Sequence, residues 1–217
     1  MFKFDLYSNV DDVIDHRCVG RLKYMGADMV RERISRRQRL IEVGADLFCD
    51  QSYEEVAIDD IASSAGISKG LLYYYFPTKH DFYIAIVEYA AAQLLAATEA
   101  DATLEPMERL RTSLEAYYAY VERHAKAYVS LLRGGVGVDE QVAAIIDMVR
   151  QTYIQGILQS FAQETQASAL SAIAVRGWVG FVEATSIAWL EQRSISRQAL
   201  CDLAMTAFTL VVPHDQS

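Results

Sequence analysis

Apolar side chains recur every three to four residues along most of the chain, which is the period of an α-helix. The first clear stretch predicts a helix over about 31–50. A second, short helix follows, in which Ile61 and Ala62 share one face. Gly66 should end this helix, because glycine is favoured just past a helix C-terminus.

Side chains that cap helices mark most of the later helix starts. Ser68 can cap a third helix that ends near Tyr75, since Pro77 cannot continue it. Thr78 and Asp81 have the spacing of a capping box and predict the next start. Pro106 suits a first helical position, and Asp139, Ser168 and Ser196 are further caps. The remaining predicted helices are 79–100, 106–124, 126–133, 139–164, 168–192 and 196 to just before Pro213.

These segments predict an all-α fold of about nine helices. The chain shows no alternating strand pattern, no glycine-rich phosphate loop and no internal repeat. Residues 1–30 have only weak helical periodicity, and Met25 or Met29 could be alternative starts, so we treat this stretch as an N-terminal extension of uncertain status.

Composition places the chain among folded globular proteins. It has 217 residues, of which 52% are apolar and 23% charged. Its three cysteines, Cys18, Cys49 and Cys201, are widely spaced, which fits a reduced cytosol and excludes a disulfide framework or a cysteine zinc site. We expect no metal or cofactor, no secretory signal and no membrane span.

The charge distribution is uneven. The net charge of −9 should repel nucleic acid overall, yet five arginines and one glutamate lie between residues 31 and 39. Positive charge near a helix N-terminus opposes the helix dipole. It becomes understandable if a phosphate backbone lies nearby, although a solvated helix face is the simpler alternative for an arginine cluster.

The two short helices and the turn between them have the form of a helix-turn-helix. Gly66 permits the left-handed backbone of the turn, and Ile67 and Leu72 fill the core beneath it. An outward face then remains for contacts with phosphates and bases. It carries Lys69, Gly70, Tyr73 and Tyr74.

From residue 33 to residue 87 the chain resembles the DNA-binding domain of the TetR family of bacterial transcriptional regulators. The matching positions, at the family's spacing, are Leu47–Phe48, Tyr53, Ile61–Ala62, Gly66, Ile67, Ser68, Lys69–Gly70, Leu72–Tyr73, Phe76 and Lys79. The chain departs from the family at Ser52 (usually glycine) and at Ala57 and Leu71 (often threonine). Alanine cannot cap the second helix, so either the cap comes from elsewhere or the helix start frays. Leucine could read a base only through an apolar contact such as a thymine methyl.

The resemblance implies a helix-turn-helix domain at 31–78 and an effector-binding and dimerisation domain at 79–217. It implies contacts with a double-stranded, palindromic operator. The candidate contact residues are Arg33, Arg36, Arg37, Ser68, Lys69, Gly70, Leu71, Tyr73, Tyr74, Tyr75 and Lys79.

TetR-like proteins also bind a small effector among their later helices, which are rich in large aromatic residues here. Aromatic rings at helical spacing are more often plain core, but tyrosine suits a ligand cavity because an apolar ring carries a polar tip. The candidate effector residues are Tyr117, His124, Tyr153, Trp178 and Phe181. The identity of the effector does not follow from them.

The predicted helix 168–192 is apolar nearly all round, so it should be buried on all sides. Gly177, Gly180, Ala184 and Ala188 form a row of small residues on it. This pattern, with the resemblance, favours a homodimer formed by the eighth and ninth helices; a central helix of a monomer is the alternative.

The function expected is a cytoplasmic, nucleoid-associated repressor that a small effector releases from its operator. A helical small-molecule enzyme is one alternative, although the chain shows no metal-spaced cluster and no nucleophile motif. An interaction adaptor that has lost DNA binding is the other.

Overall fold

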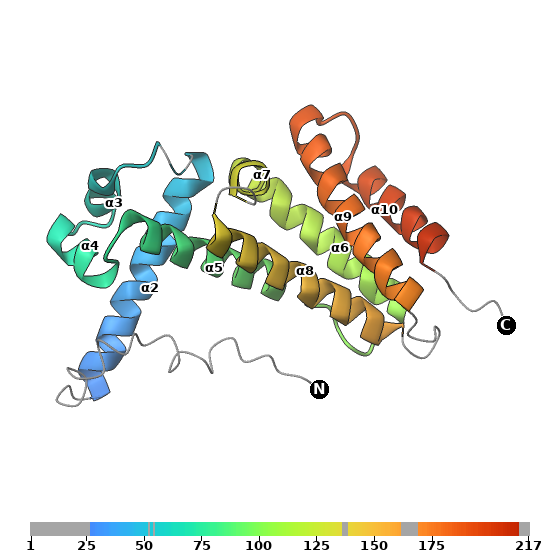
Figure 1. The fold of residues 1–217 in the computed structure, drawn as a ribbon, viewed down its shortest axis with the longest axis horizontal. Coiled ribbons are helices and arrows are strands. Elements are labelled where there is room, and N and C mark those ends of the chain that lie inside the picture. Colours follow the sequence, from blue (N-terminus) through green and yellow to red (C-terminus); the bar gives the residue numbers. More distant parts are fainter. Residues whose placement is uncertain (1–26, 52, 54, 136–138, 162–168, 213–217) are drawn as a thin grey trace. The chain divides into compact units, whose positions relative to one another are not determined.

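The computed structural model describes residues 27–51, 53, 55–135, 139–161 and 169–212. Within these ranges the only regular elements are nine α-helices and one π-helical turn, which confirms the all-α prediction (Figure 1). The helices are α2 (Ala27–Asp50), α3 (Ile58–Ser64), α4 (Lys69–Tyr75), α5 (Lys79–Ala97), α6 (Pro106–Arg123), α7 (Ala125–Ser130), α8 (Glu140–Ser160), α9 (Ala169–Gln192) and α10 (Arg197–Val211), and the π turn η1 is Leu131–Gly135.

The predicted caps are present wherever the structure describes them. Ser68 Oγ accepts from the Leu71 amide at 3.2 Å, and Ser196 Oγ accepts from the amide of residue 199 at 3.1 Å. Asp139 accepts from the amides of residues 141 and 142. Thr78 and Asp81 form the expected capping box, each side chain accepting the other's amide at 3.0 Å. Ser168 lies outside the described residues.

Several helix ends differ from the prediction. α2 begins at Ala27, inside the stretch treated as an extension. α5 ends at Ala97, and the Thr98 hydroxyl that follows lies 2.9 Å from the carbonyl of Leu94 and 3.1 Å from that of Leu95. The expected helix 126–133 is instead α7 followed by the π turn, and α8 stops at Ser160.

The described residues form two compact units. One contains 27–47 and Val56–Ile86, and the other contains Phe48–Glu55 and the residues from Val87 onward. Phe82 lies in the core of the first unit. It is fully buried and packs edge-on against Phe76 with ring centroids 4.8 Å apart. The boundary between the units falls within α5, so this helix belongs to both.

The core of the second unit is built around α6, α8, α9 and α10. The Trp178 indole on α9 donates to the Ala204 carbonyl on α10 at 2.8 Å and meets the Phe208 ring edge-on. Of the described helices, α9 alone is long and apolar enough to cross a membrane by composition, with a mean hydropathy of 1.2 over its most apolar window. Eight of its side chains are buried against the other helices, and we interpret it as the core helix of this unit.

Candidate DNA-binding surface and effector site

The turn between α3 and α4 is shaped by Gly66. This glycine has φ +65°, where a side chain would be strained. Its amide donates to the Ser63 carbonyl at 3.0 Å, and the next amide, of Ile67, donates to the Ala62 carbonyl at 2.9 Å. This pair of bonds is a Schellman motif, so the helix end predicted from Gly66 is confirmed in detail.

The start of α3 obtains its cap from an acidic side chain. Ala57 makes no side-chain hydrogen bond, and its own amide donates to Asp60 Oδ2 at 3.3 Å. Of the two alternatives left by the missing threonine, a cap from elsewhere is therefore the one observed. A carboxylate here satisfies an orphan amide but cannot donate a hydrogen bond to a phosphate.

The outward face of α4 consists of the side chains that the sequence placed there. Tyr73 and Tyr74 are 45% and 53% exposed, whereas Leu72 is fully buried beneath them. Lys69 and Gly70 are exposed, and Leu71 and Tyr75 are half-buried. A Cβ added at residue 70 would meet only Ser68 Oγ, at 4.0 Å, so packing within the chain does not require this glycine.

Two of the candidate cations are held by carboxylates. Lys69 Nζ lies 2.6 Å from Asp59 of α3, and the Arg36 guanidinium lies 2.5 Å from Glu32, one turn earlier on α2. All four side chains are more than half exposed. Such ion pairs contribute only about 0–1 kcal/mol in water, so a phosphate can compete for either cation.

Two other candidate arginines rest on aromatic rings. The Arg33 guanidinium carbon lies 5.0 Å from the centroid of the Tyr74 ring, and that of Arg37 lies 4.9 Å from the centroid of the Phe76 ring. Both distances are within the range of a cation–π contact. These contacts and the Lys69–Asp59 pair could not be predicted from the sequence, because each joins different elements. Lys79, the last candidate, is half-buried at the start of α5.

Of the candidate effector residues, the structure brings Tyr117 and Tyr153 together. Their ring centroids are 6.4 Å apart inside the second unit. The Tyr117 hydroxyl is hydrogen-bonded to that of Tyr128 on α7, and the Tyr153 hydroxyl lies 3.0 Å from Thr98 Oγ1. The Thr98 hydroxyl also lies within hydrogen-bond distance of two carbonyls of α5, so it joins Tyr153 to the end of that helix. Sequence reasoning counted Tyr128 only as one aromatic among several, and nothing in the sequence pointed to Thr98.

Burial keeps these phenols neutral. It raises the pKa of Tyr117, Tyr128 and Tyr153 well above the usual value near 10. The adjacent charge is balanced, because Glu183 on α9 accepts from Arg150 on α8 in a bidentate ion pair with contacts of 2.8–3.0 Å. The cluster therefore offers neutral hydroxyls that donate and accept hydrogen bonds.

The other three candidate effector residues lie apart from that cluster in their contacts. Trp178 turns its indole towards α10, as described above. His124 lies at the junction of α6 and α7, and its ring rests on Tyr120 with centroids 4.5 Å apart. Phe181 is half-buried on α9.

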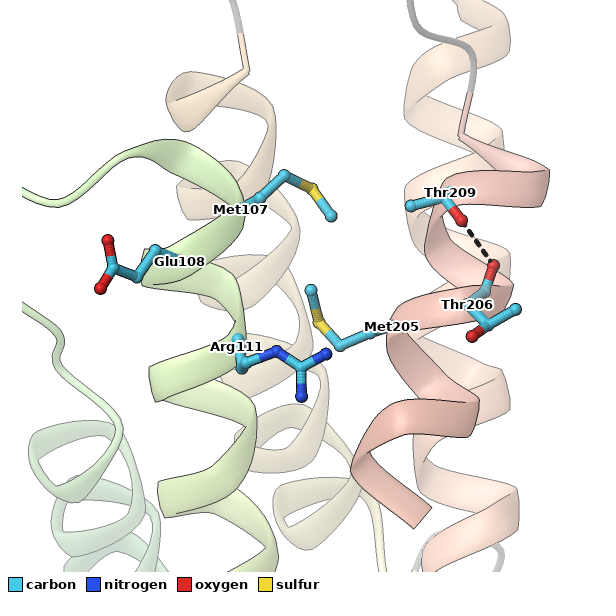
Figure 2. Close-up of a pocket in the computed structure, with 6 residues that line it drawn as sticks. All are labelled: Met107, Glu108, Arg111, Met205, Thr206 and Thr209. Carbon is cyan, nitrogen blue, oxygen red and sulfur yellow. Dashed lines mark hydrogen bonds between the residues drawn. The ribbon is translucent and has the colours of Figure 1, made fainter. Parts of the chain in front are cut away.

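A separate pocket of about 490 Å³, open to solvent, lies between α6 and α10. Figure 2 shows Met107, Met205 and Arg111 pointing into the space between the two helices, with Glu108 directed away from it. Thr206 and Thr209 complete the lining, and no candidate effector residue takes part. Arg111 is paired with Asp202 at 2.7 Å and lowers the pKa of that carboxyl, so its charge is already balanced.

The described part of the chain contains no group of three or more His, Cys, Asp or Glu side chains that could hold a metal ion.

Two family models match the chain. Residues 40–86 match "Bacterial regulatory proteins, tetR family", and residues 106–211 match "Tetracyclin repressor-like, C-terminal domain". The crystal structure of a TetR-family transcriptional regulator from Streptomyces coelicolor is 34% identical and superposes with a TM-score of 0.77. The match covers 86% of this chain and 82% of that one.

Curated relatives include both an activator and a repressor of transcription. The transcriptional activator FasR of Mycolicibacterium smegmatis is 26% identical over 61% of this chain, and the transcriptional repressor KstR2 of Mycobacterium tuberculosis is 32% identical over 42% of it. The chain spans 62% and 46% of the lengths of these two relatives. The family models and the similarity to the Streptomyces coelicolor protein show that the chain belongs to the TetR family, whose members are DNA-binding regulators of transcription.

Proposed function

We propose that this regulator is a dimeric repressor that acts at the nucleoid in the cytoplasm and is released from a palindromic operator by a small-molecule effector. In this proposal the domain 31–78 contacts DNA together with Lys79 at the start of α5, and the domain 79–217 binds the effector and forms the dimer. The observation that carries it is the exposed face of α4, whose tyrosines and lysine are left uncovered while Leu72 anchors the helix from below.

The DNA surface combines this face with the arginines of α2. Tyr73, Tyr75, Lys69 and Lys79 are suited to phosphates, and a backbone without a side chain at Gly70 allows close approach. α4 contains no Arg, Asn or Gln, the residues that pair with purine edges in two hydrogen bonds. Base reading by this helix would therefore depend on apolar contact from Leu71. The full set of proposed contacts is Arg33, Arg36, Arg37, Ser68, Lys69, Gly70, Leu71, Tyr73, Tyr74, Tyr75 and Lys79.

Replacing Lys69 or Lys79 with alanine should weaken binding to every duplex, operator or not. Each lost phosphate contact should lower the slope of log K against log salt by about 0.9 per subunit. Fluorescence anisotropy across a salt series measures both quantities. Lys126→Ala, at an exposed lysine of α7, is the matched control and should leave the slope unchanged. A Lys69 variant with altered base preference and an unchanged slope would refute the assignment to phosphates.

The dimer is proposed to form through α9 and α10, where apolar residues lie uncovered. Leu170 and Ile173 on α9 are 63% and 68% exposed, and Leu210 on α10 is 80% exposed. On the same helix α9, a Cβ added at Gly177 or Gly180 would have no atom within 4 Å. Contacts within one subunit therefore do not explain these glycines, whereas close approach of a second copy would.

The effector is proposed to bind where the hydroxyl cluster lies. Tyr117, Tyr128, Tyr153 and Thr98 come from four different helices or helix ends and meet inside the second unit. A ligand with neutral donors and acceptors could replace the hydrogen bonds that these side chains now make to one another. Of the sequence candidates, Tyr117 and Tyr153 belong to this cluster, whereas Trp178 and His124 make their described contacts elsewhere.

Effector and operator should weaken each other's binding by the same factor, because coupling between two sites is reciprocal. A ligand found by thermal-shift screening should bind about 5–150-fold more weakly to the operator-bound protein than to the free protein. Isothermal titration with and without operator measures this ratio. Equal affinities would mean that the ligand site is not coupled to DNA. A tighter complex in the presence of operator would contradict release, because the ligand would then strengthen operator binding.

A further inference from the structure

Two arginines one turn apart on α2 lie over two aromatic rings at the C-terminal end of α4. The surroundings of the two contacts differ. Arg37 lies over Phe76, which is 2% exposed and belongs to the core of its unit. Arg33 lies over Tyr74, which is 53% exposed and contributes little to that core. The second contact therefore lies at the surface, on the face proposed to meet DNA.

The Arg33–Tyr74 contact uses only the face of the ring. The guanidinium carbon is 5.0 Å from the ring centroid, where the negative face of the ring attracts a cation. The ring needs no hydroxyl for this. Among the described side chains no carboxylate pairs with Arg33, so its N–H groups remain available to a phosphate.

Neighbouring cations are held in another way. Arg36 and Lys69 are each paired with a carboxylate, which a phosphate must displace. Among the side chains that the structure describes, Arg33 has no ion pair, and the ring of Tyr74 fixes its position instead. A cation fixed by a ring keeps its full charge towards DNA and loses less side-chain freedom when it binds.

We propose that Tyr74 is a positioning residue for DNA binding: the face of its ring holds Arg33 against the phosphate backbone, and its hydroxyl is not required. This inference rests on the proposed DNA-binding surface and assigns a role within it. It separates Tyr74 from Tyr73, which has no stacked arginine among the described contacts and is proposed to act through its hydroxyl.

The test is a double-mutant cycle on the full-length protein with Tyr74→Phe, Tyr74→Leu, Arg33→Ala and the Leu–Ala double variant. Affinity is measured on a mixed-sequence duplex several turns long at low salt, because phosphate contacts do not depend on sequence. Tyr74→Phe keeps the ring face over Arg33 and should bind more tightly than Tyr74→Leu. Tyr74→Leu should bind roughly two- to fivefold more weakly per subunit, the range expected for an exposed cation–π contact.

Non-additivity is the decisive readout. On the Arg33→Ala background, Tyr74→Leu should cause no further loss, because the residue it positions is absent. The matched control is Arg36→Ala, whose loss should add fully to that of Tyr74→Leu, since Arg36 lies on no ring in the described structure. Thermal melting should show all variants folded, as Tyr74 is exposed and Arg33 is only half-buried.

Two results would overturn the inference while leaving the DNA-binding surface in place. One is a Tyr74→Phe variant as weak as Tyr74→Leu, which would assign the role to the hydroxyl. The other is a full sum of losses in the Arg33–Tyr74 double variant. A wild-type protein that retains no duplex at all would instead refute the proposed surface, and this inference with it.

Discussion

Replacing Gly177 with glutamate should turn a dimer into a monomer and weaken operator binding by about 10²–10⁴-fold. In a two-fold interface the same residue occurs on both sides, so one substitution places two carboxylates in an apolar contact. Leaving a buried charge unpaired costs several kcal/mol for each ion. Loss of the dimer then removes the gain from binding two half-sites at once, which accounts for the expected factor.

The single subunit should tolerate this change. Residue 177 is exposed, and a Cβ there would meet no atom within 4 Å. Gly156→Glu on α8 is the matched control, since Gly156 is also helical, exposed and free of neighbours within 4 Å, but lies away from the proposed interface. Light scattering gives the mass of each variant. A Gly177→Glu protein that remains a stable dimer would place the interface elsewhere.

Replacing Gly44 with leucine should destabilise the helix-turn-helix unit by about 3 kcal/mol and abolish DNA binding. Gly44 lies where α2 passes α5, and a Cβ there would fall 2.4 Å from the Phe82 ring and 2.6 Å from Ile86. Both neighbours are buried, so neither has room to move. Overpacking of this kind typically costs about 1–3 kcal/mol, and leucine adds three further carbons beyond Cβ.

Replacing Gly44 with alanine sets two opposing effects against each other: the higher helix propensity of alanine and the clash of its Cβ with buried side chains. In a helix interior, alanine is favoured over glycine by about 1 kcal/mol. At Gly156, which has open space, this preference should win and Gly156→Ala should raise the melting temperature. At Gly44 the clash should win and Gly44→Ala should lower it. Differential scanning calorimetry of the two variants checks both signs, and a stabilised Gly44→Ala protein would contradict the tight contact.

The helix-turn-helix part of the fold could be predicted in detail, because the residues that start and end its helices act locally. Gly66, Ser68 and the Thr78–Asp81 pair each act on a backbone group within a few residues, so the residue type alone indicates the geometry. The contacts made at a distance were not predicted. Helical periodicity indicates which face of α2 is polar, but not that Arg33 would lie over Tyr74.

The effector half was predicted less well for the same reason. A large aromatic residue on one face of a helix can pack against any of several neighbouring helices. In the structure, different aromatic residues contact different helices. Tyr117 and Tyr153 meet near Thr98, whereas Trp178 hydrogen-bonds to α10. A threonine just past a helix end carries no sequence signal that it will share a hydrogen bond with a residue 55 positions later.

The sharing of α5 between the two units limits how the chain length can vary. Lys79–Ile86 belongs to one unit and Val87–Ala97 to the other, within one continuous helix. Each residue added to a helix turns everything beyond it by about 100° and advances it by about 1.5 Å. One residue inserted between Ile86 and Val87 would therefore turn the buried face of Val87–Ala97, which includes Ala91, by about 100° along the helix from the buried face of Lys79–Ile86, which includes Phe82. In this protein the number of residues in α5 is as much a constraint as their identity.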